Sequence, residues 1–162
     1  MLRAITFVGM VVLATGHGDH GEGHARDHEQ ATKLTASNWH TVENDHHVWV
    51  VKFFSNMCGS CKEWRKQWHV LQSAVDGLHY GEVNVDIKEN VGLAKKLGVL
   101  QEGIPHVKLF NLARMPVTLM GGGKTVPARE LVGQLRKALS SHKAEAGSSG
   151  FYLSPTQDSS EL

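Results

Sequence analysis

The chain has 162 residues, of which 41% are hydrophobic and 20% are charged, and its formal net charge is +1. This length and composition are typical of one globular domain whose core is large enough to be stable without disulfide support. Seventeen basic residues against sixteen acidic ones provide no overall basic field, which argues against nucleic acid as a partner. The chain contains two cysteines and eleven histidines.

The N-terminal sequence MLRAITFVGMVVLATG is typical of a secretory signal peptide. Arg3 precedes an uncharged apolar run at residues 4–14, and the small residues that follow offer a cleavage site near Gly16. A membrane anchor is the alternative, but the run is shorter than the roughly 20 residues that a spanning helix needs. We therefore expect residues 1–16 to be removed in the secretory pathway, with no stable membrane insertion afterwards.

Residues 17–30, HGDHGEGHARDHEQ, combine four histidines with acidic residues and glycines. Such a segment can bury little apolar surface, so we expect a disordered N-terminus in the mature protein. Its imidazoles could bind zinc, copper or nickel weakly. Because the sequence shows no rigid geometry for a metal, we favour a solvated tail whose charge changes around pH 6 to 7.

From residue 31 onward, apolar residues recur with the periods of strands and helices. The expected elements are a short strand and a brief helix within 33–45, a buried strand at 48–54, an amphipathic helix at 59–74, a strand at 82–87, a helix at 91–99, strands at 106–110 and 115–120, and a last helix at 128–139. This order predicts an α/β fold in which helices flank both faces of a central mixed sheet. We expect the domain to comprise residues 31–142, and the Ser/Gly-rich residues 143–162 to form a disordered tail.

Cys58 and Cys61 are separated by two residues, between the central strand and the amphipathic helix. A disulfide across so short a loop would remove little entropy from the unfolded chain, so it would be a poor structural cross-link. A zinc site would need four ligands, and only His69 lies nearby, so we expect no metal here. A reactive dithiol remains, because a C-x-x-C between a strand and a helix is a redox signature and the helix N-terminus stabilises a thiolate, mainly on Cys58.

The sequence CGSC after VWVVKFFSNM, followed by EVNVD and GVLQEGIPHVKLF, resembles the thioredoxin fold and, more closely, a single protein-disulfide-isomerase domain. The similarity covers residues 34–139. It implies a thiol-disulfide oxidoreductase of protein substrates in which Cys58 attacks, Cys61 resolves the intermediate, and no cofactor is needed. It also implies a cis bond between Ile104 and Pro105 beside the cysteines, where the backbone pairs with a substrate chain.

Several positions depart from the family pattern. Met57, an expected substrate contact, replaces a tryptophan before the first cysteine. Between the cysteines, Gly59 matches both the CGPC thioredoxins and the CGHC isomerases, whereas Ser60 replaces their proline or histidine, and we expect a more reducing potential than that of a CGHC isomerase. Lys52 stands where the family has a buried acid, and the lysine that partners this acid falls on Glu82. The resemblance thus implies a reversed pair that either relays a proton or merely packs as an ion pair with slower catalysis.

The sequence leaves further alternatives open. A thioredoxin-fold chaperone or binding module with weak redox activity is the second interpretation, favoured by Lys52 and Met57. The C-terminal Ser-Ser-Glu-Leu matches an ER-retrieval signal of the Lys-Asp-Glu-Leu type only in its last two residues. We therefore expect the endoplasmic reticulum lumen, with secretion as the alternative, and the redox partner is not indicated.

Overall fold

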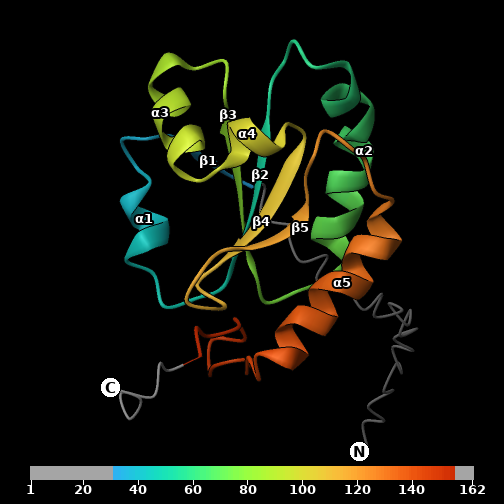
Figure 1. Ribbon diagram of the computed structural model, residues 1–162. Helices are drawn as coiled ribbons and strands as arrows, with labels where there is room; N and C mark the ends of the chain where they lie inside the picture. The colour runs from blue at the N-terminus through green and yellow to red at the C-terminus, as the bar shows by residue number, and fades with distance from the viewer. Residues whose placement is uncertain (1–30, 156–162) are drawn as a thin grey trace, which may run out of the picture.

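The architecture was established from a computed structural model that describes residues 31–155 (Figure 1). The expected signal peptide, the histidine-rich segment and the last seven residues, 156–162, lie outside the described residues. The elements are, in chain order, β1 (Thr32–Leu34), α1 (His40–Glu43), β2 (Trp49–Phe54), α2 (Gly59–Ala74), β3 (His79–Asn84), α3 (Lys88–Lys96), α4 (Val99–Glu102), β4 (His106–Phe110), β5 (Val117–Met120) and α5 (Ala128–Ser141). No helix within the described range is long and apolar enough to cross a membrane.

The five strands form one mixed sheet in the order β1-β3-β2-β4-β5. Strands β1, β3 and β2 are parallel, whereas β4 and β5 are antiparallel to their neighbours. β2 occupies the centre because its side chains, nearly all β-branched or aromatic, are buried on both faces. The predicted mixed sheet is therefore confirmed.

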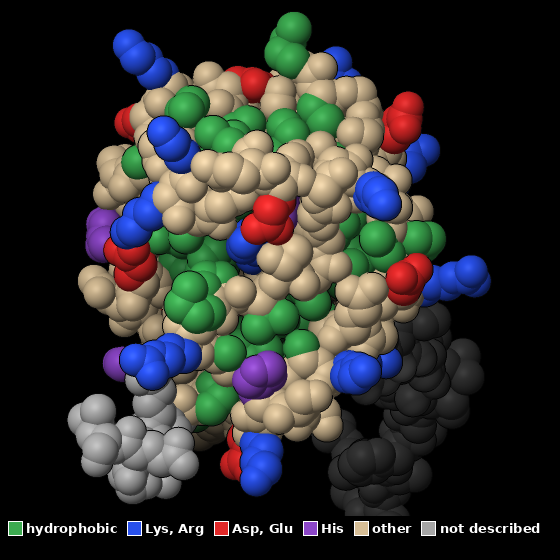
Figure 2. Space-filling view, viewed as in Figure 1, with side chains coloured by type: hydrophobic (Ala, Val, Ile, Leu, Met, Phe, Trp, Pro, Cys, Tyr) green, Lys and Arg blue, Asp and Glu red, His purple; other side chains and the backbone are tan. Residues whose placement is uncertain are grey.

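Helices cover both faces of the sheet: α2 and α5 pack on one, and α1, α3 and α4 on the other (Figure 1). Alternate residues of β2 serve the two cores, with Val50 facing α2 and α5, and Val51 and Phe53 facing the opposite layer. On α2, Trp64 and Trp68 recur one turn apart and are buried against the sheet. On the face drawn in Figure 2, basic and acidic side chains are interspersed, with no large area of one sign among the described residues.

The third strand lies earlier than the sequence indicated, at His79–Asn84 and not at 82–87. Alternating apolar residues continue beyond Asn84, but the backbone there already turns toward α3. At the N-terminal side the strand includes Gly81, where an added Cβ would collide with Leu34 of β1. The glycine leaves room for the Leu34 side chain, although in sequence it resembles the end of a turn.

Residues 143–155 form a folded segment, here called the C-terminal strap. The Val48 N–H donates to the Tyr152 carbonyl (2.9 Å), and the Tyr152 N–H donates to the Gly77 carbonyl (2.7 Å). His47 forms an antiparallel bridge with Leu153, and the Tyr152 side chain packs on the core. The prediction of a disordered tail from residue 143 is therefore wrong for residues 143–155, because backbone hydrogen bonds hold this strap without any periodic pattern of side chains.

Candidate active site

Cys58 and Cys61 are joined by a disulfide bond at the start of α2. Cys58 is the N-cap of the helix, and its sulfur accepts a hydrogen bond from the Cys61 N–H (3.1 Å). Cys61, inside the first turn, is buried with 8% of its surface exposed, whereas Cys58 is half-buried. The N-terminal N–H groups and the positive end of the helix dipole favour negative charge on Cys58. The arrangement thus offers the Cys58 sulfur to a partner molecule and keeps Cys61 covered.

The loop before Cys58 is held by a carboxylate that sequence reasoning did not single out. Asp86 accepts hydrogen bonds from the Ser55 hydroxyl (2.6 Å) and from the Asn56 N–H (2.7 Å). The Ser55 oxygen in turn accepts from the Met57 N–H (2.9 Å). These contacts set the path of the chain into Cys58, while the Met57 side chain remains 86% exposed. An acidic residue just past the strand adjacent to β2 was the signal that could have revealed this brace.

The two residues between the cysteines have different surroundings. The Ser60 hydroxyl lies 3.3 Å from the Cys58 sulfur, within hydrogen-bonding range for sulfur. At Gly59 an added Cβ would meet no atom within 4 Å, so this position is open to a partner or to other side chains. Ser60 is therefore placed to donate a hydrogen bond to a Cys58 thiolate.

The peptide bond between Ile104 and Pro105 is cis, as the resemblance implied. Pro105 is buried and directly precedes β4, whose first residue, His106, pairs with Phe53 near the end of β2. The chain reaches Cys58 from that same end of β2. The cis bond and the cysteine loop therefore lie at the same end of the sheet, where β2 ends and β4 begins (Figure 1).

Lys52 and Glu82 form the expected ion pair. They are register partners on β2 and β3, and the lysine Nζ lies 2.7 Å from the glutamate Oε1. The Lys52 ammonium also lies 4.8 Å from the ring of Phe54 and 5.0 Å from that of Trp68 on α2. Burial lowers the pKa of Lys52, although the hydrogen bond and charge of Glu82 oppose this shift. The reversed polarity of the pair is thus present, on the sheet face that carries α2.

A second buried polar group follows the cis proline and was missed by sequence reasoning. The His106 side chain is fully buried, with Nδ1 3.2 Å from the Gly103 carbonyl and Nε2 3.5 Å from a Glu102 oxygen. Lys108, on the same face of β4, donates to the other Glu102 oxygen (3.2 Å). Burial lowers the pKa of His106. In the sequence HVKLF these residues simply occupy alternate positions of a strand, so nothing marks them as a cluster.

Comparison with known proteins decides the family. A family model described as "Thioredoxin" matches residues 30–136. The chain belongs to the thioredoxin family.

Among curated members, it is 29% identical over 109 residues to Protein disulfide-isomerase A6 of Mus musculus and of Homo sapiens. Each of these alignments covers 65% of this chain and 24% of the relative. The Protein disulfide-isomerase A6 homolog of Drosophila melanogaster is 32% identical over 98 residues, covering 59% of this chain and 22% of the relative. The chain thus spans about a quarter of the length of these relatives.

Solved structures confirm the thioredoxin fold. The Trx4 domain of ERdj5 superposes with a TM-score of 0.59 at 19% identity, covering 68% of this chain and 96% of that domain. The J-Trx1 fragment of ERdj5 superposes with a TM-score of 0.57 at 22% identity, covering 68% of this chain and 52% of the fragment. At these identities the likeness concerns the fold, and it confirms the predicted α/β class.

Proposed function

We propose that this thioredoxin-family protein is a thiol-disulfide oxidoreductase that exchanges disulfides with protein substrates. The observation that carries the proposal is the Cys58–Cys61 disulfide at the N-terminus of α2, with one sulfur accessible and the other covered. The names of the curated relatives, which are protein disulfide-isomerases, support the same activity.

The chemistry proceeds through a mixed disulfide. In the reduced protein, the Cys58 thiolate attacks one sulfur of a substrate disulfide, so the Cys58–substrate bond forms and the other substrate sulfur leaves as a thiolate. Cys61, deprotonated, then attacks the Cys58 sulfur and releases the second substrate thiolate. The substrate gains two electrons, and the protein is left with the Cys58–Cys61 disulfide. The same steps in reverse oxidise a substrate dithiol.

We assign substrate contact to the end of the sheet at which the cysteine loop and the cis proline both lie. Met57 offers an exposed, flexible apolar side chain next to the attacking sulfur. Ile104 and Pro105 offer backbone directly before β4, with which a substrate segment can pair as an added strand. This mode of binding uses hydrogen bonds to the backbone of the substrate, so it suits proteins of varied sequence.

Within this proposal, the Lys52–Glu82 pair serves as the proton acceptor for Cys61. Cys61 must lose a proton before it can resolve the mixed disulfide, and it is buried in the layer that faces this pair. The lowered pKa of Lys52 makes its neutral form more accessible than that of an exposed lysine. Glu82, which is 23% exposed, links the pair to solvent.

A second candidate is a thioredoxin-fold chaperone or binding module whose dithiol is only weakly active. The exposed Met57 favours it, since an apolar side chain beside the cysteines can hold unfolded chains without any exchange of disulfides. The chaperone would suppress aggregation equally well when its cysteines are replaced by serine, whereas an oxidoreductase would not reduce disulfides in that form.

We place the protein in the secretory pathway, in the lumen of the endoplasmic reticulum, with secretion as the alternative. The N-terminal sequence and the likeness to disulfide-isomerases support this placement. Expression of the full chain followed by N-terminal sequencing and cell fractionation tests it. An uncleaved N-terminus on a cytosolic protein would contradict it.

The decisive experiment measures the Cys58/Cys61 equilibrium against glutathione together with the reduction of insulin. The wild type is expected to reduce insulin, Cys58→Ser to lose this activity, and Cys61→Ser to accumulate the mixed disulfide. His69→Ala, an exposed change on the same helix, serves as the matched control. Unchanged insulin reduction by Cys58→Ser would refute the proposed activity.

A further inference from the structure

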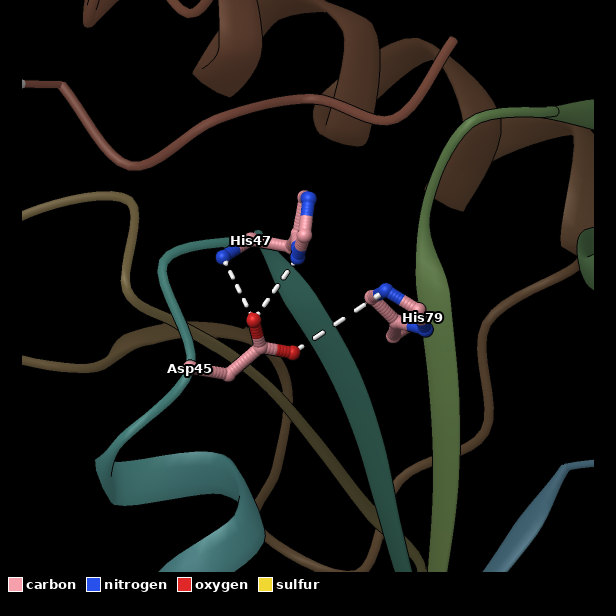
Figure 3. Close-up of side chains that lie close together, drawn as sticks. All are labelled: Asp45, His47 and His79. Atoms are coloured by element: carbon pink, nitrogen blue, oxygen red, sulfur yellow. Dashed lines mark hydrogen bonds and ion pairs between the residues drawn. The ribbon is translucent and has the colours of Figure 1, made fainter. Parts of the chain in front are cut away.

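Three potential metal ligands converge at the end of the sheet opposite the cysteines. Asp45 and His47 lie in the loop that leads into β2, and His79 is the first residue of β3 (Figure 3). Each offers one ligand atom, and these atoms all lie within 4.8 Å of one another. All three side chains are partly buried. A loop and a strand that are distant in sequence thus bring two imidazoles and a carboxylate together.

We propose that Asp45, His47 and His79 form a zinc-binding site. The His47 Nδ1 is hydrogen-bonded to Asp45 Oδ1 (2.7 Å), and the His79 Nε2 lies 3.9 Å from the other oxygen of the same carboxylate, Oδ2. In tetrahedral zinc sites with ligands at ~2.0 to 2.2 Å, the ligand atoms are ~3.4 Å apart, so one of these contacts is shorter and the other longer than zinc requires. Zinc would replace the His47–Asp45 hydrogen bond and draw the three ligand atoms, which lie within 4.8 Å of one another, to this spacing. The fourth position would be open to water.

The donor set selects the class of metal. Imidazole nitrogen suits zinc and other late first-row metals, whereas magnesium and calcium prefer oxygen ligands alone. Two neutral imidazoles and one carboxylate also match the three-ligand sets that hold zinc with an open position.

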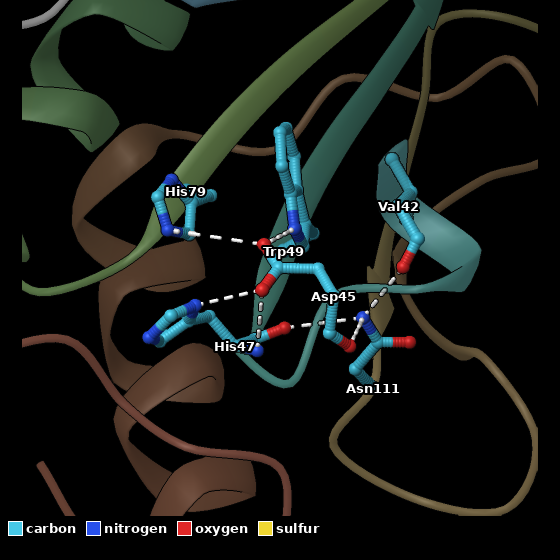
Figure 4. A network of polar contacts seen from close by, with 6 residues as sticks. All are labelled: Val42, Asp45, His47, Trp49, His79 and Asn111. Carbon is cyan, nitrogen blue, oxygen red and sulfur yellow. Dashed lines mark hydrogen bonds and ion pairs between the residues drawn. The ribbon is translucent and has the colours of Figure 1, made fainter. Parts of the chain in front are cut away.

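The carboxylate of Asp45 is already oriented by contacts outside the ligand set. The Trp49 indole N–H donates to Asp45 Oδ2 (2.7 Å), and the His47 backbone N–H donates to Oδ1 (3.1 Å) (Figure 4). Asn111 fixes the loop itself, because its amide donates to the carbonyls of Val42, Asp45 and His47 (2.8, 3.1 and 3.1 Å). Such supporting contacts hold metal ligands in place and raise affinity.

His79 is held by stacking. Its ring stacks on Trp49, with centroids 4.9 Å apart, and on Phe151 of the C-terminal strap, with centroids 4.5 Å apart. The strap also bridges to His47 through Leu153. Zinc at this site would therefore tie the loop before β2 to β3 and stabilise the docking of the strap.

The site is independent of the proposed redox function. The length of β2, roughly 20 Å, separates it from the cysteine loop. The cysteine thiolates and the histidines of residues 17–28 could also bind zinc, so the experiment must exclude both. In the disulfide form the cysteines cannot bind zinc. Replacement of His17, His20, His24 and His28 by alanine removes the N-terminal histidines.

Zinc binding is measured on the full chain in this oxidised, fourfold-substituted background, by equilibrium dialysis with metal analysis and by thermal unfolding, with magnesium in parallel. We expect one zinc per chain and, at zinc a hundredfold above Kd, a rise of about 5 to 10 °C in Tm. Magnesium should leave Tm unchanged. The proposal would be overturned if the oxidised, fourfold-substituted chain bound no zinc, or if magnesium raised its Tm as much as zinc does.

Single substitutions locate the metal. Asp45→Asn, which keeps an oxygen acceptor for Trp49, and His79→Gln should each weaken zinc binding by at least about tenfold. His69→Ala, an exposed change on α2, should bind zinc as the background does. Cobalt bound in place of zinc should show the visible spectrum of a tetrahedral site, and Asp45→Asn should lose it. Equal zinc affinity in the cluster variants and the control would place the metal elsewhere, whatever the outcome of the insulin assay.

Discussion

Lys52 and Glu82 face each other across β2 and β3, with Nζ 2.7 Å from Oε1. The pair reverses the polarity that the resemblance assigns to the family, an acid on the central strand and a lysine beside it. Lys52 is buried, and its pKa is lowered by that burial despite the neighbouring carboxylate. A lysine in this layer is tolerable because its charge has a partner.

Glu82→Ala is expected to destabilise the protein by about 1 to 3 kcal/mol. Removal of one partner from a fully buried ion pair costs about 3 to 5 kcal/mol, and Glu82 is partly exposed, so its removal should cost less. The double change Lys52→Met/Glu82→Leu should recover most of the loss, because it leaves no buried charge. Urea unfolding of the single and double variants measures this, and a double variant as unstable as the sum of the single variants would contradict it.

The same pair should affect turnover if it accepts the Cys61 proton. Lys52→Ala and Glu82→Ala should slow insulin reduction by about tenfold or more, within the range of general base catalysis. The loss should be greatest at the resolving step, so more mixed disulfide should accumulate than in the wild type. If neither variant changes the turnover, the pair is only an ion pair of the core.

Ser60 should set part of the reduction potential. Its hydroxyl is within hydrogen-bonding range of the Cys58 sulfur, so Ser60→Ala should raise the pKa of the Cys58 thiol and slow its attack at neutral pH. Ser60→His, which creates the CGHC sequence, should shift the potential upward by tens of millivolts, since thioredoxin and disulfide isomerase differ by ~90 mV. Equilibration with glutathione measures the reduction potential, and the absorbance of the thiolate as pH is varied measures the pKa of the Cys58 thiol. A Ser60→His potential equal to or below that of the wild type would show that other groups dominate.

Asp86 is expected to matter for both stability and activity. Asp86→Ala removes the acceptor of the Ser55 hydroxyl and of the Asn56 N–H, and should cost about 1 to 2 kcal/mol because both bonds go to an ionised group near the surface. The freed loop should hold Cys58 less well, so kcat/KM for insulin should fall. Glu89→Ala removes the same charge from an exposed position on α3 and serves as the control. If Asp86→Ala and Glu89→Ala had the same stability and the same kcat/KM, Asp86 would not brace the cysteine loop.

His106 should make stability fall in mild acid. Its pKa is lowered by burial and by the charge of Lys108, against the Gly103 carbonyl and Glu102, so the folded state binds a proton later than the unfolded chain does. The stabilisation is complete above the unfolded pKa of about 6.5 and is lost as pH falls through the folded pKa. Unfolding free energies between pH 7.5 and about 5 should therefore decline less steeply in His106→Gln than in the wild type. His69→Gln, an exposed control, should keep the wild-type slope, and an unchanged slope in His106→Gln would contradict the assignment.

Local patterns carried most of the fold prediction. The 59–74 helix was predictable because Trp64, Trp68 and Leu71 recur at helical spacing, and the central strand because its apolar run is short and β-branched. The cis bond at Pro105 and the pairing of Lys52 with Glu82 came from the resemblance to a family. The start of β3 was misplaced because Gly81 resembles the end of a turn in sequence, whereas in the fold it lies within the strand and leaves room for the Leu34 side chain.

By itself, the sequence determined the cysteine pair, its place between a strand and a helix, and the layering of the domain, because spacing along the chain dictates which side chains share a face. Only the tertiary structure decided which residues support that chemistry from a distance. The Asp86 brace, the Asp45–His47–His79 cluster and the C-terminal strap each join segments remote in sequence. The contacts that complete them, from Asp86 to Ser55, from His79 to Asp45 and from Tyr152 to Val48, join segments whose positions the packed sheet sets, so no short window of sequence contains both partners.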